Sequence, residues 1–122
     1  MSVGTFAEAL EDIAKRVPET EVLMILGTDG IPIERLIVRA DPNMEAVAAE
    51  LTTLLRASLS AAADTGLGAL HELSIETERM TALLVSITPE YFLFASFSPG
   101  ALIGRARFAL GLAKGGLARE FE

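Results

Sequence analysis

Residues 51–63 read LTTLLRASLSAAA, and Arg56 is the only charged side chain among them. A helix on the surface of a globular domain normally has a polar face opposite its apolar stripe, because only one side is removed from water. Spacings of three and four residues place one long stripe on a single side of this helix: Met44, Val47, Leu51, Leu54, Leu55, Ser58, Leu59 and Ala62. We predict that this stripe packs against the protein's own core.

The other side of the same helix has too little charge for a face in water. It carries Glu45, Ala49, Thr53, Arg56 and Ser60, most of which are small. Small side chains let a second helix approach closely, so we predict burial on both sides, against the sheet of the chain and against a partner. The alternative is a helix enclosed within one protomer. A chain of 122 residues has few elements left to cover a second helix face, which favours the partner.

Composition limits the class of protein. The 122 residues fit a single domain, residues 1–122, and 51% hydrophobic with 22% charged residues is typical of a folded chain. The absence of cysteine excludes disulfides and thiolate zinc sites. A net charge of −7 opposes binding to nucleic acid. The sequence has neither a secretory signal nor an apolar run of transmembrane length, so we expect a cytoplasmic protein that does not insert into membranes.

Local signals order the elements of the first half of the chain. The capping-box sequence Thr5-Phe6-Ala7-Glu8 predicts the start of a first helix. An unbroken apolar run within 21–26 predicts a strand covered on both faces, and Asp29-Gly30 predicts a hairpin turn into a second strand at 31–39. Pro32 cannot donate a ladder hydrogen bond, so we predict that this second strand lies at a sheet edge.

The second half begins with the long helix. Asp41-Pro42 predicts its start, and Gly66 and Gly68 predict its end. Three strands joined by short turns follow, at 69–77, 80–88 and 91–98. Ser98-Pro99 then predicts the start of a last helix. The order αββαβββα indicates an α+β fold, a five-stranded and mainly antiparallel sheet with helices on both faces.

Few residues in the chain suit catalysis. His71 is the only histidine, and we predict a structural role for it in the third strand. Glu72 and Glu76 alternate along that strand, which is typical of a solvent face. Arg105 and Arg107 in the last helix are interpreted as solvated or paired surface residues. No serine lies in a nucleophile elbow and no glycine cluster matches a phosphate loop. We expect no catalytic residue, no metal and no cofactor, hence a protein that is not an enzyme.

Three segments together carry a family resemblance. They are ILGTDGIPIE at 25–34, the alanine-rich second helix, and GRARF at 104–108. With the order of elements, they resemble the Roadblock/dynein light chain family over nearly the whole chain. The sequence is most similar to the bacterial branch, which includes gliding-motility proteins that act on Ras-like GTPases.

The resemblance implies a dimer, since family members form homodimers or heterodimers in which the third strands pair edge to edge and the second helices pack together. Applied to this chain, it implies an edge around Leu70, Leu73 and Ile75. It also implies a contact, at or near the paired second helices, that includes Ala49, Thr53, Arg56 and Ser60. Whether the partner subunit is identical stays open.

The same resemblance implies a function. Family members typically serve as platforms for small GTPases, some stimulating GTP hydrolysis and others acting as scaffolds. We therefore expect a homodimeric regulator or scaffold that binds a Ras-like small GTPase. Arg56 is available to contact an acidic switch region or a phosphate, and the alternative is an Arg56 that is solvated or forms a salt bridge within the dimer. The alternative is a dimerisation or sensory module for a receptor, kinase or cytoskeletal assembly without a GTPase.

Overall fold

The computed structural model describes residues 5–39 and 43–122. Within these ranges the chain forms three helices and five strands. In chain order they are α1 (Phe6–Arg16), β1 (Thr20–Gly27), β2 (Pro32–Ile37), α2 (Met44–Asp64), β3 (Glu72–Glu76), β4 (Thr81–Thr88), β5 (Tyr91–Phe97) and α3 (Ile103–Glu120).

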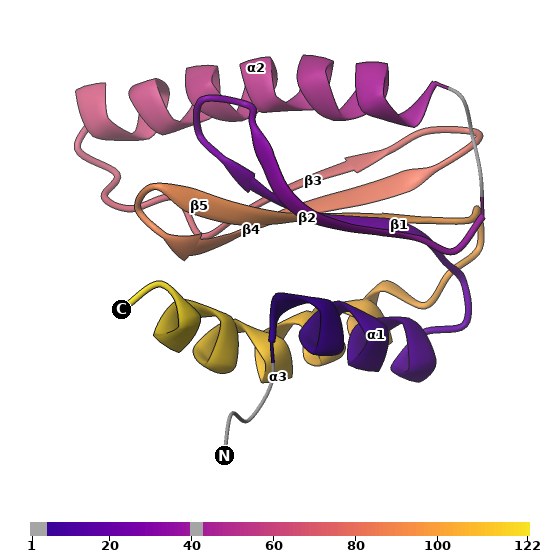
Figure 1. The fold of residues 1–122 in the computed structure, drawn as a ribbon. Helices are drawn as coiled ribbons and strands as arrows, with labels where there is room; N and C mark the ends of the chain where they lie inside the picture. The colour runs from indigo at the N-terminus through magenta and orange to yellow at the C-terminus, as the bar shows by residue number, and fades with distance from the viewer. Residues whose placement is uncertain (1–4, 40–42) are drawn as a thin grey trace.

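The sheet is the middle of three layers. Its strands follow the order β2-β1-β5-β4-β3, and every neighbouring pair is antiparallel. Helices α1 and α3 cover one face, and α2 covers the other (Figure 1). The predicted fold class and element order are confirmed. The strand that begins with Pro32 lies at one edge, as predicted, and β3 lies at the opposite edge.

Helix α2 shares its face of the sheet with no other helix of the described chain (Figure 1). The alternative of a helix enclosed within one protomer is therefore wrong. One side of α2 packs against the sheet, as predicted. A partner on its other side stays a prediction.

Local chemistry explains where the elements begin and turn. The capping box of α1 is confirmed, because Thr5 Oγ1 accepts a hydrogen bond from the Glu8 amide at 3.1 Å and the Glu8 carboxylate accepts one from the Thr5 amide at 3.0 Å. Gly30 in the β1–β2 turn and Gly66 just beyond α2 have φ of 88° and 71°. Only glycine adopts such values at little cost, so the predicted turn and helix end are both confirmed.

Two apolar clusters pack against the two faces of the sheet. The cluster under α1 and α3 includes Leu10, Ile13, Phe97 and Leu110, and the cluster under α2 includes Met24, Met44, Leu55, Leu84 and Phe94. Partly buried Leu70, Leu73 and Ile75 pack against the second cluster. Strand β3 is thus attached to the rest of the fold on the same face that α2 covers.

Two predicted element boundaries are wrong, and a third lies outside the described residues. The third strand was expected at 69–77, but β3 spans only Glu72–Glu76, so His71 precedes it and is exposed. The last helix does not begin at Ser98-Pro99. The Ser98 carbonyl instead accepts a hydrogen bond from the Ala101 amide in a turn, and α3 starts at Ile103 without a side-chain cap. The predicted cap Asp41-Pro42 lies outside the described residues.

The core side of α2 is rotated from the predicted one. Leu54, expected in the core stripe, is 46% exposed, whereas Thr52 is 3% exposed. The Thr52 hydroxyl donates to the Ala48 carbonyl at 2.7 Å, and this bond within the helix allows a polar side chain to be buried. The other residues of the predicted stripe are buried or half-buried. Leu54 therefore belongs to the surface of the protomer.

Candidate functional site

The outward side of α2 carries little charge for an exposed surface. Its exposed residues from 53 to 61 are Thr53, Leu54, Arg56, Ala57, Ser60 and Ala61. Arg56 is the single charged residue between Glu50 and Asp64. All four helix residues predicted at an interface are thus exposed: Thr53, Arg56 and Ser60 lie in this stretch, and Ala49 lies one turn before it. A helix side of this kind suits contact with another protein better than contact with water alone.

One flank of α2 faces the β1–β2 hairpin. Arg56 Nη1 donates to the Thr28 carbonyl at 3.2 Å, and Arg35 of β2 forms an ion pair with Glu45. Leu54 lies about 160° around the helix from Arg56, at about 100° per residue. Because β2 and β3 occupy opposite edges of the sheet, the Leu54 flank faces the β3 side. The two flanks of α2 therefore differ: one is held by Arg56, and the other exposes Leu54.

The edge residues expected from the family resemblance lie together near this apolar flank. Leu73 and Ile75 are in β3, and Leu70 lies just before the strand. All three are half-buried in the cluster under α2. The structure thus brings Leu70, Leu73 and Ile75 next to one another at the sheet edge.

A salt bridge joins the start of β3 to α3. Arg107 Nη2 lies 2.9 Å from Glu72 Oε2, and Arg107 Nε lies 3.1 Å and 3.0 Å from the two carboxylate oxygens. The predicted solvent face for Glu72 is thus corrected, because its side chain is 29% exposed and paired. The hydrogen bond to Glu72 and then its negative charge raise the pKa of Arg107.

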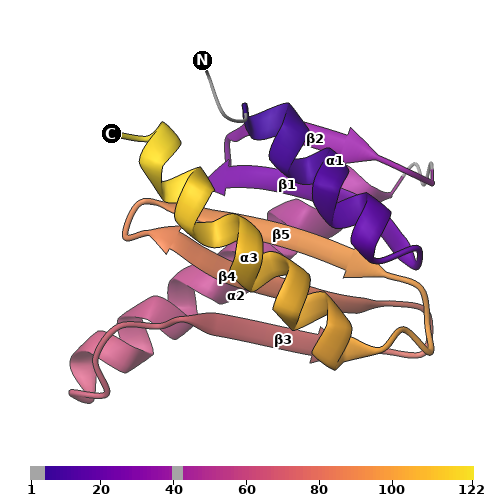
Figure 2. The same cartoon turned by 90° about the horizontal axis from the view of Figure 1, so that it is seen from below.

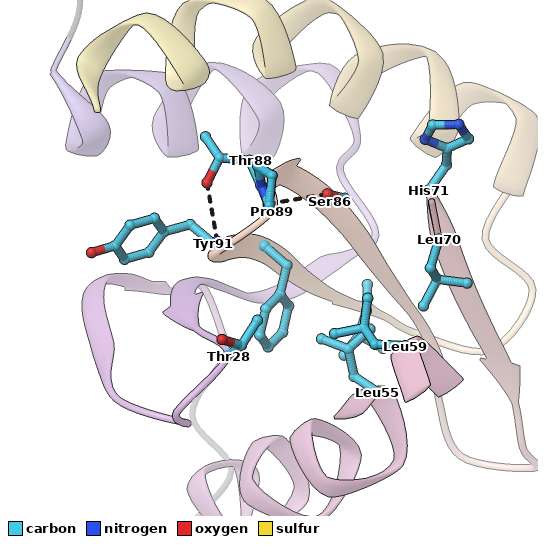
Figure 3. Close-up of a pocket in the computed structure, with 11 residues that line it drawn as sticks. Thr28, Leu55, Leu59, Leu70, His71, Ser86, Thr88, Pro89 and Tyr91 are labelled. Atoms are coloured by element: carbon cyan, nitrogen blue, oxygen red, sulfur yellow. Dashed lines mark hydrogen bonds between the residues drawn. The ribbon is translucent and has the colours of Figure 1, made fainter. Parts of the chain in front are cut away.

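A small pocket lies under the C-terminal half of α2, beside the β4–β5 turn (Figure 3). Leu55, Leu59 and Leu70 are among its apolar lining residues. The Ser86 hydroxyl donates to the Thr88 carbonyl at 3.2 Å, so it is already engaged. Figure 3 shows the His71 ring on the α3 side, away from Leu55 and Leu59. The pocket offers an apolar cleft and pairs no histidine with a nucleophile.

The described residues offer neither a metal cluster nor a membrane-spanning helix. Among residues 5–39 and 43–122, no three side chains of the metal-binding types gather in one place. No helix in the described part is long and apolar enough to span a lipid bilayer.

Sequence reasoning missed two residues of this region. Leu54 fitted the core stripe by its spacing, and only the position of the sheet under α2 shows it to be exposed. The pairing of Arg107 with Glu72 joins residues 35 positions apart, so no local pattern could reveal it. The raised content of basic residues in the last helix was the one available signal.

Comparison with solved structures finds this fold in bacterial proteins. An MglB structure described as having a tetrameric arrangement gives a TM-score of 0.82 at 18% identity, covering 93% of this chain and 85% of that one. The gliding protein MglB from Thermus thermophilus gives 0.81 at 18% identity with the same coverage. MglC from Myxococcus xanthus gives 0.71 at 24% identity, covering 94% of this chain and 98% of that one. At these identities the likeness concerns the fold.

Sequence comparison gives the family. No curated protein sequence matches the chain at a significant level. The Roadblock/LC7 domain, however, matches residues 6–97, which is most of the chain from the start of α1 to the end of β5. The resemblance inferred from the three segments is thereby confirmed: the chain belongs to the Roadblock/LC7 family.

Proposed function

We propose that two copies of this chain pair through β3 and the Leu54 flank of α2, and that the paired α2 helices bind a Ras-like small GTPase. The protein acts on the GTPase by contact, as a regulator or a scaffold, and is not itself an enzyme. The observation that carries the proposal is the outward side of α2, which is exposed in one protomer yet has only Arg56 as a charged residue between Glu50 and Asp64.

The pairing is supported by the apolar exposure beside β3. Leu54 is 46% exposed although it lies in a helix that packs on the sheet. Joining two copies at their β3 edges brings two such flanks together, which removes apolar surface from water. The Thermus and Myxococcus proteins share this fold, and one MglB structure is described as tetrameric, which agrees with self-association in proteins of this shape.

A GTPase is the partner that the family favours. The bacterial branch that the sequence resembles includes gliding-motility proteins that act on Ras-like GTPases. The family resemblance put Ala49, Thr53, Arg56 and Ser60 at or near the contact of the paired helices, which stays a prediction. Because Ala49 lines a groove with Arg35 of β2, we instead assign these exposed residues to the partner surface of the proposed dimer. A GTPase whose switch loops fit this surface in one nucleotide state would have its population shifted toward that state.

Arg56 is the charged group available for the GTPase. In the free protomer its guanidinium is held by the Thr28 carbonyl, a single neutral acceptor. A carboxylate or phosphate oxygen is a stronger acceptor, so Arg56 can exchange Thr28 for an acidic switch residue or a phosphate of the GTPase.

The test has two steps, so that dimer and partner are separated. Light scattering after size-exclusion chromatography measures the solution mass, and a monomer at all concentrations would contradict the pairing. The tagged protein is then used to capture partners from extract of its own cells with GDP or a non-hydrolysable GTP analogue. The expected result is a Ras-like GTPase enriched in one nucleotide state, followed by direct binding and GTP-hydrolysis assays with the purified pair.

The same capture tests the alternative. Recovery of a receptor or kinase with no GTPase in either nucleotide state would overturn the GTPase proposal and favour a dimerisation or sensory module. A GTPase that binds while its hydrolysis rate is unchanged would identify a scaffold, and a faster rate would identify an activator.

A further inference from the structure

We infer that β3 pairs with β3 of a second copy in one register, centred on Ser74, in which Arg107 bridges its own Glu72 and the partner's Glu76. The inference rests on the proposed dimer and adds to it a defined register and a residue from α3. Four observations lead to it, beginning with the direction of the backbone groups in β3.

The hydrogen bonds to β4 show which backbone groups of β3 point away from the sheet. The Ser86 amide donates to the His71 carbonyl at 3.0 Å, and the Thr77 amide donates to the Met80 carbonyl at 2.8 Å. Residues of an antiparallel pair alternate between bonded and non-bonded positions. The residues with backbone groups that face outward are therefore Glu72, Ser74 and Glu76.

These outward groups are ready to pair with another strand. The register of β3 with β4 runs without a bulge over all five residues, so the edge is regular. No side chain in the described ranges hydrogen-bonds to the outward amides of Glu72, Ser74 or Glu76. Leu73 and Ile75 anchor the strand on the α2 side, so their side chains do not block the edge.

Symmetry then selects the register. Two identical antiparallel strands related by a two-fold axis must place outward residues opposite outward residues. Full overlap of the three positions occurs only when Ser74 lies opposite Ser74 of the partner subunit. A shift by two residues in either direction loses outward pairs. In the full-overlap register, Glu72 lies opposite the partner's Glu76.

Two carboxylates facing each other across a strand pair would be destabilising without a cation. Arg107 supplies one on the same face of the sheet, since it lines a groove with Ser74 and Glu76 at the β3 edge. It binds Glu72 through Nε and Nη2, and its Nη1 makes no hydrogen bond within the described chain. The side chain is 49% exposed, so its free donors can reach the partner's Glu76.

The absence of cysteine allows a direct test of register. In Ser74→Cys the two new thiols meet at the axis, where Cα atoms of a hydrogen-bonded pair are about 5.5 Å apart, within the range that a disulfide spans. In Glu76→Cys the two thiols are about 13 Å apart, four residues along the strand. We expect mild oxidation to cross-link Ser74→Cys into dimers on a non-reducing gel, and to leave Glu76→Cys as monomers.

Further single-cysteine variants complete this experiment. A mixture of Glu72→Cys and Glu76→Cys chains is expected to cross-link, and Arg35→Cys on the opposite edge is not. If Glu76→Cys cross-links faster than Ser74→Cys, the inferred register is wrong although the dimer stands. If the wild-type protein is a monomer by mass and none of the variants cross-links, the proposed dimer itself is wrong.

The bridge by Arg107 has its own test. We expect Arg107→Gln to raise the dimer dissociation constant about tenfold, which is the size expected for a charge-assisted hydrogen bond. The matched control is Arg105→Gln, an exposed arginine in the same helix. Adding Glu76→Gln to Arg107→Gln should recover part of the lost dimer affinity, because it removes one of the two opposed negative charges. An effect of Arg107→Gln no larger than that of the control, or no coupling with Glu76, would overturn the bridge.

Discussion

The two edges of the sheet, β2 and β3, differ in whether their backbone is available to pair with a strand of another chain. Strand β2 begins with Pro32, has a register shift where it pairs with β1, and uses the Glu34 carboxylate to accept a hydrogen bond from the Arg35 amide at 3.1 Å. Each device discourages pairing with another chain. Strand β3 has a continuous register and no proline. One edge is closed by its own residues and the other is available.

The position of α2 follows the same division. Its flank toward β2 is held to the protomer by Arg56 with Thr28 and by Glu45 with Arg35. Its flank toward β3 exposes Leu54. Exposed apolar side chains do not separate the two sides, because Ile33 and Ile37 of β2 are also exposed. What separates them is that polar contacts within the protomer hold α2 on the β2 side. The following variants are ways to test this difference.

The largest expected effect is loss of the dimer in Ser74→Pro. Proline removes the outward amide at the proposed axis but no bond to β4, so the protomer should stay folded. We expect a monomer by light scattering at concentrations where the wild-type protein is dimeric. Ile37→Pro is the matched change at an outward position of β2, and it should leave the mass unchanged. A dimer that survives Ser74→Pro would contradict pairing through β3.

The second effect is weaker dimerisation in Leu54→Glu. Burying an unpaired carboxylate costs several kcal/mol, so we expect the dissociation constant to rise on the order of a hundredfold. Ala49→Glu, on the outward side nearer to β2, should weaken GTPase capture more than it weakens the dimer. Sedimentation equilibrium gives the dimer dissociation constant of each variant, and circular dichroism checks that each variant is folded. A loss of dimer in Ala49→Glu equal to that in Leu54→Glu would move Ala49 into the helix contact.

A smaller effect is expected when the closed edge is opened. Glu34→Ala frees the outward amide of Arg35 and leaves Pro32 and the register shift in place. We expect slow association beyond the dimer at high protein concentration, measured by dynamic light scattering. Arg39→Ala, a change at an exposed charged residue outside the strand, is the control. No difference between the two variants would show that Glu34 does not protect the edge.

The smallest effect on stability is expected for Arg56→Ala. The side chain is exposed and makes one hydrogen bond to a backbone carbonyl, so the free energy of unfolding should fall by less than about 1 kcal/mol. GTPase binding or GTP hydrolysis should fall by a larger factor, because Arg56 is the charged group on the proposed surface. Urea unfolding and a single-turnover GTPase assay measure the two quantities. If both binding and hydrolysis are unchanged, Arg56 has no role in the partner contact.

Much of the fold could be predicted because its signals are local. A capping box satisfies amides one turn away, as Thr5 and Glu8 do, and glycine at positive φ marks a turn at Gly30 and a helix end at Gly66. The strands were found with errors of a few residues, the largest at β3. The start of α3 was misplaced because Ser98-Pro99 satisfies a turn as well as it satisfies a helix.

The candidate site could be predicted only in part. The low charge of 51–63 indicated an unusual helix, and the family resemblance pointed to Leu73 and Ile75 at an edge. Spacing alone put Leu54 in the core, since a helical pattern gives the side on which a residue lies and not the width of the sheet beneath it. The pairing of Arg107 with Glu72 depended on α3 crossing over β3 (Figure 2).

By itself the sequence determined the order of the elements, the two-sided cover of the sheet and the family, because hydrophobic periodicity, turn residues and caps act over a few positions along the chain. Only the tertiary structure decided which side of α2 exposes Leu54 and which cation lies beside Glu72 of β3. Those properties depend on residues brought together from distant parts of the chain, such as Arg107 with Glu72 and Arg56 with Thr28. Contacts of that kind leave no periodic pattern, since they arise from how the layers are stacked.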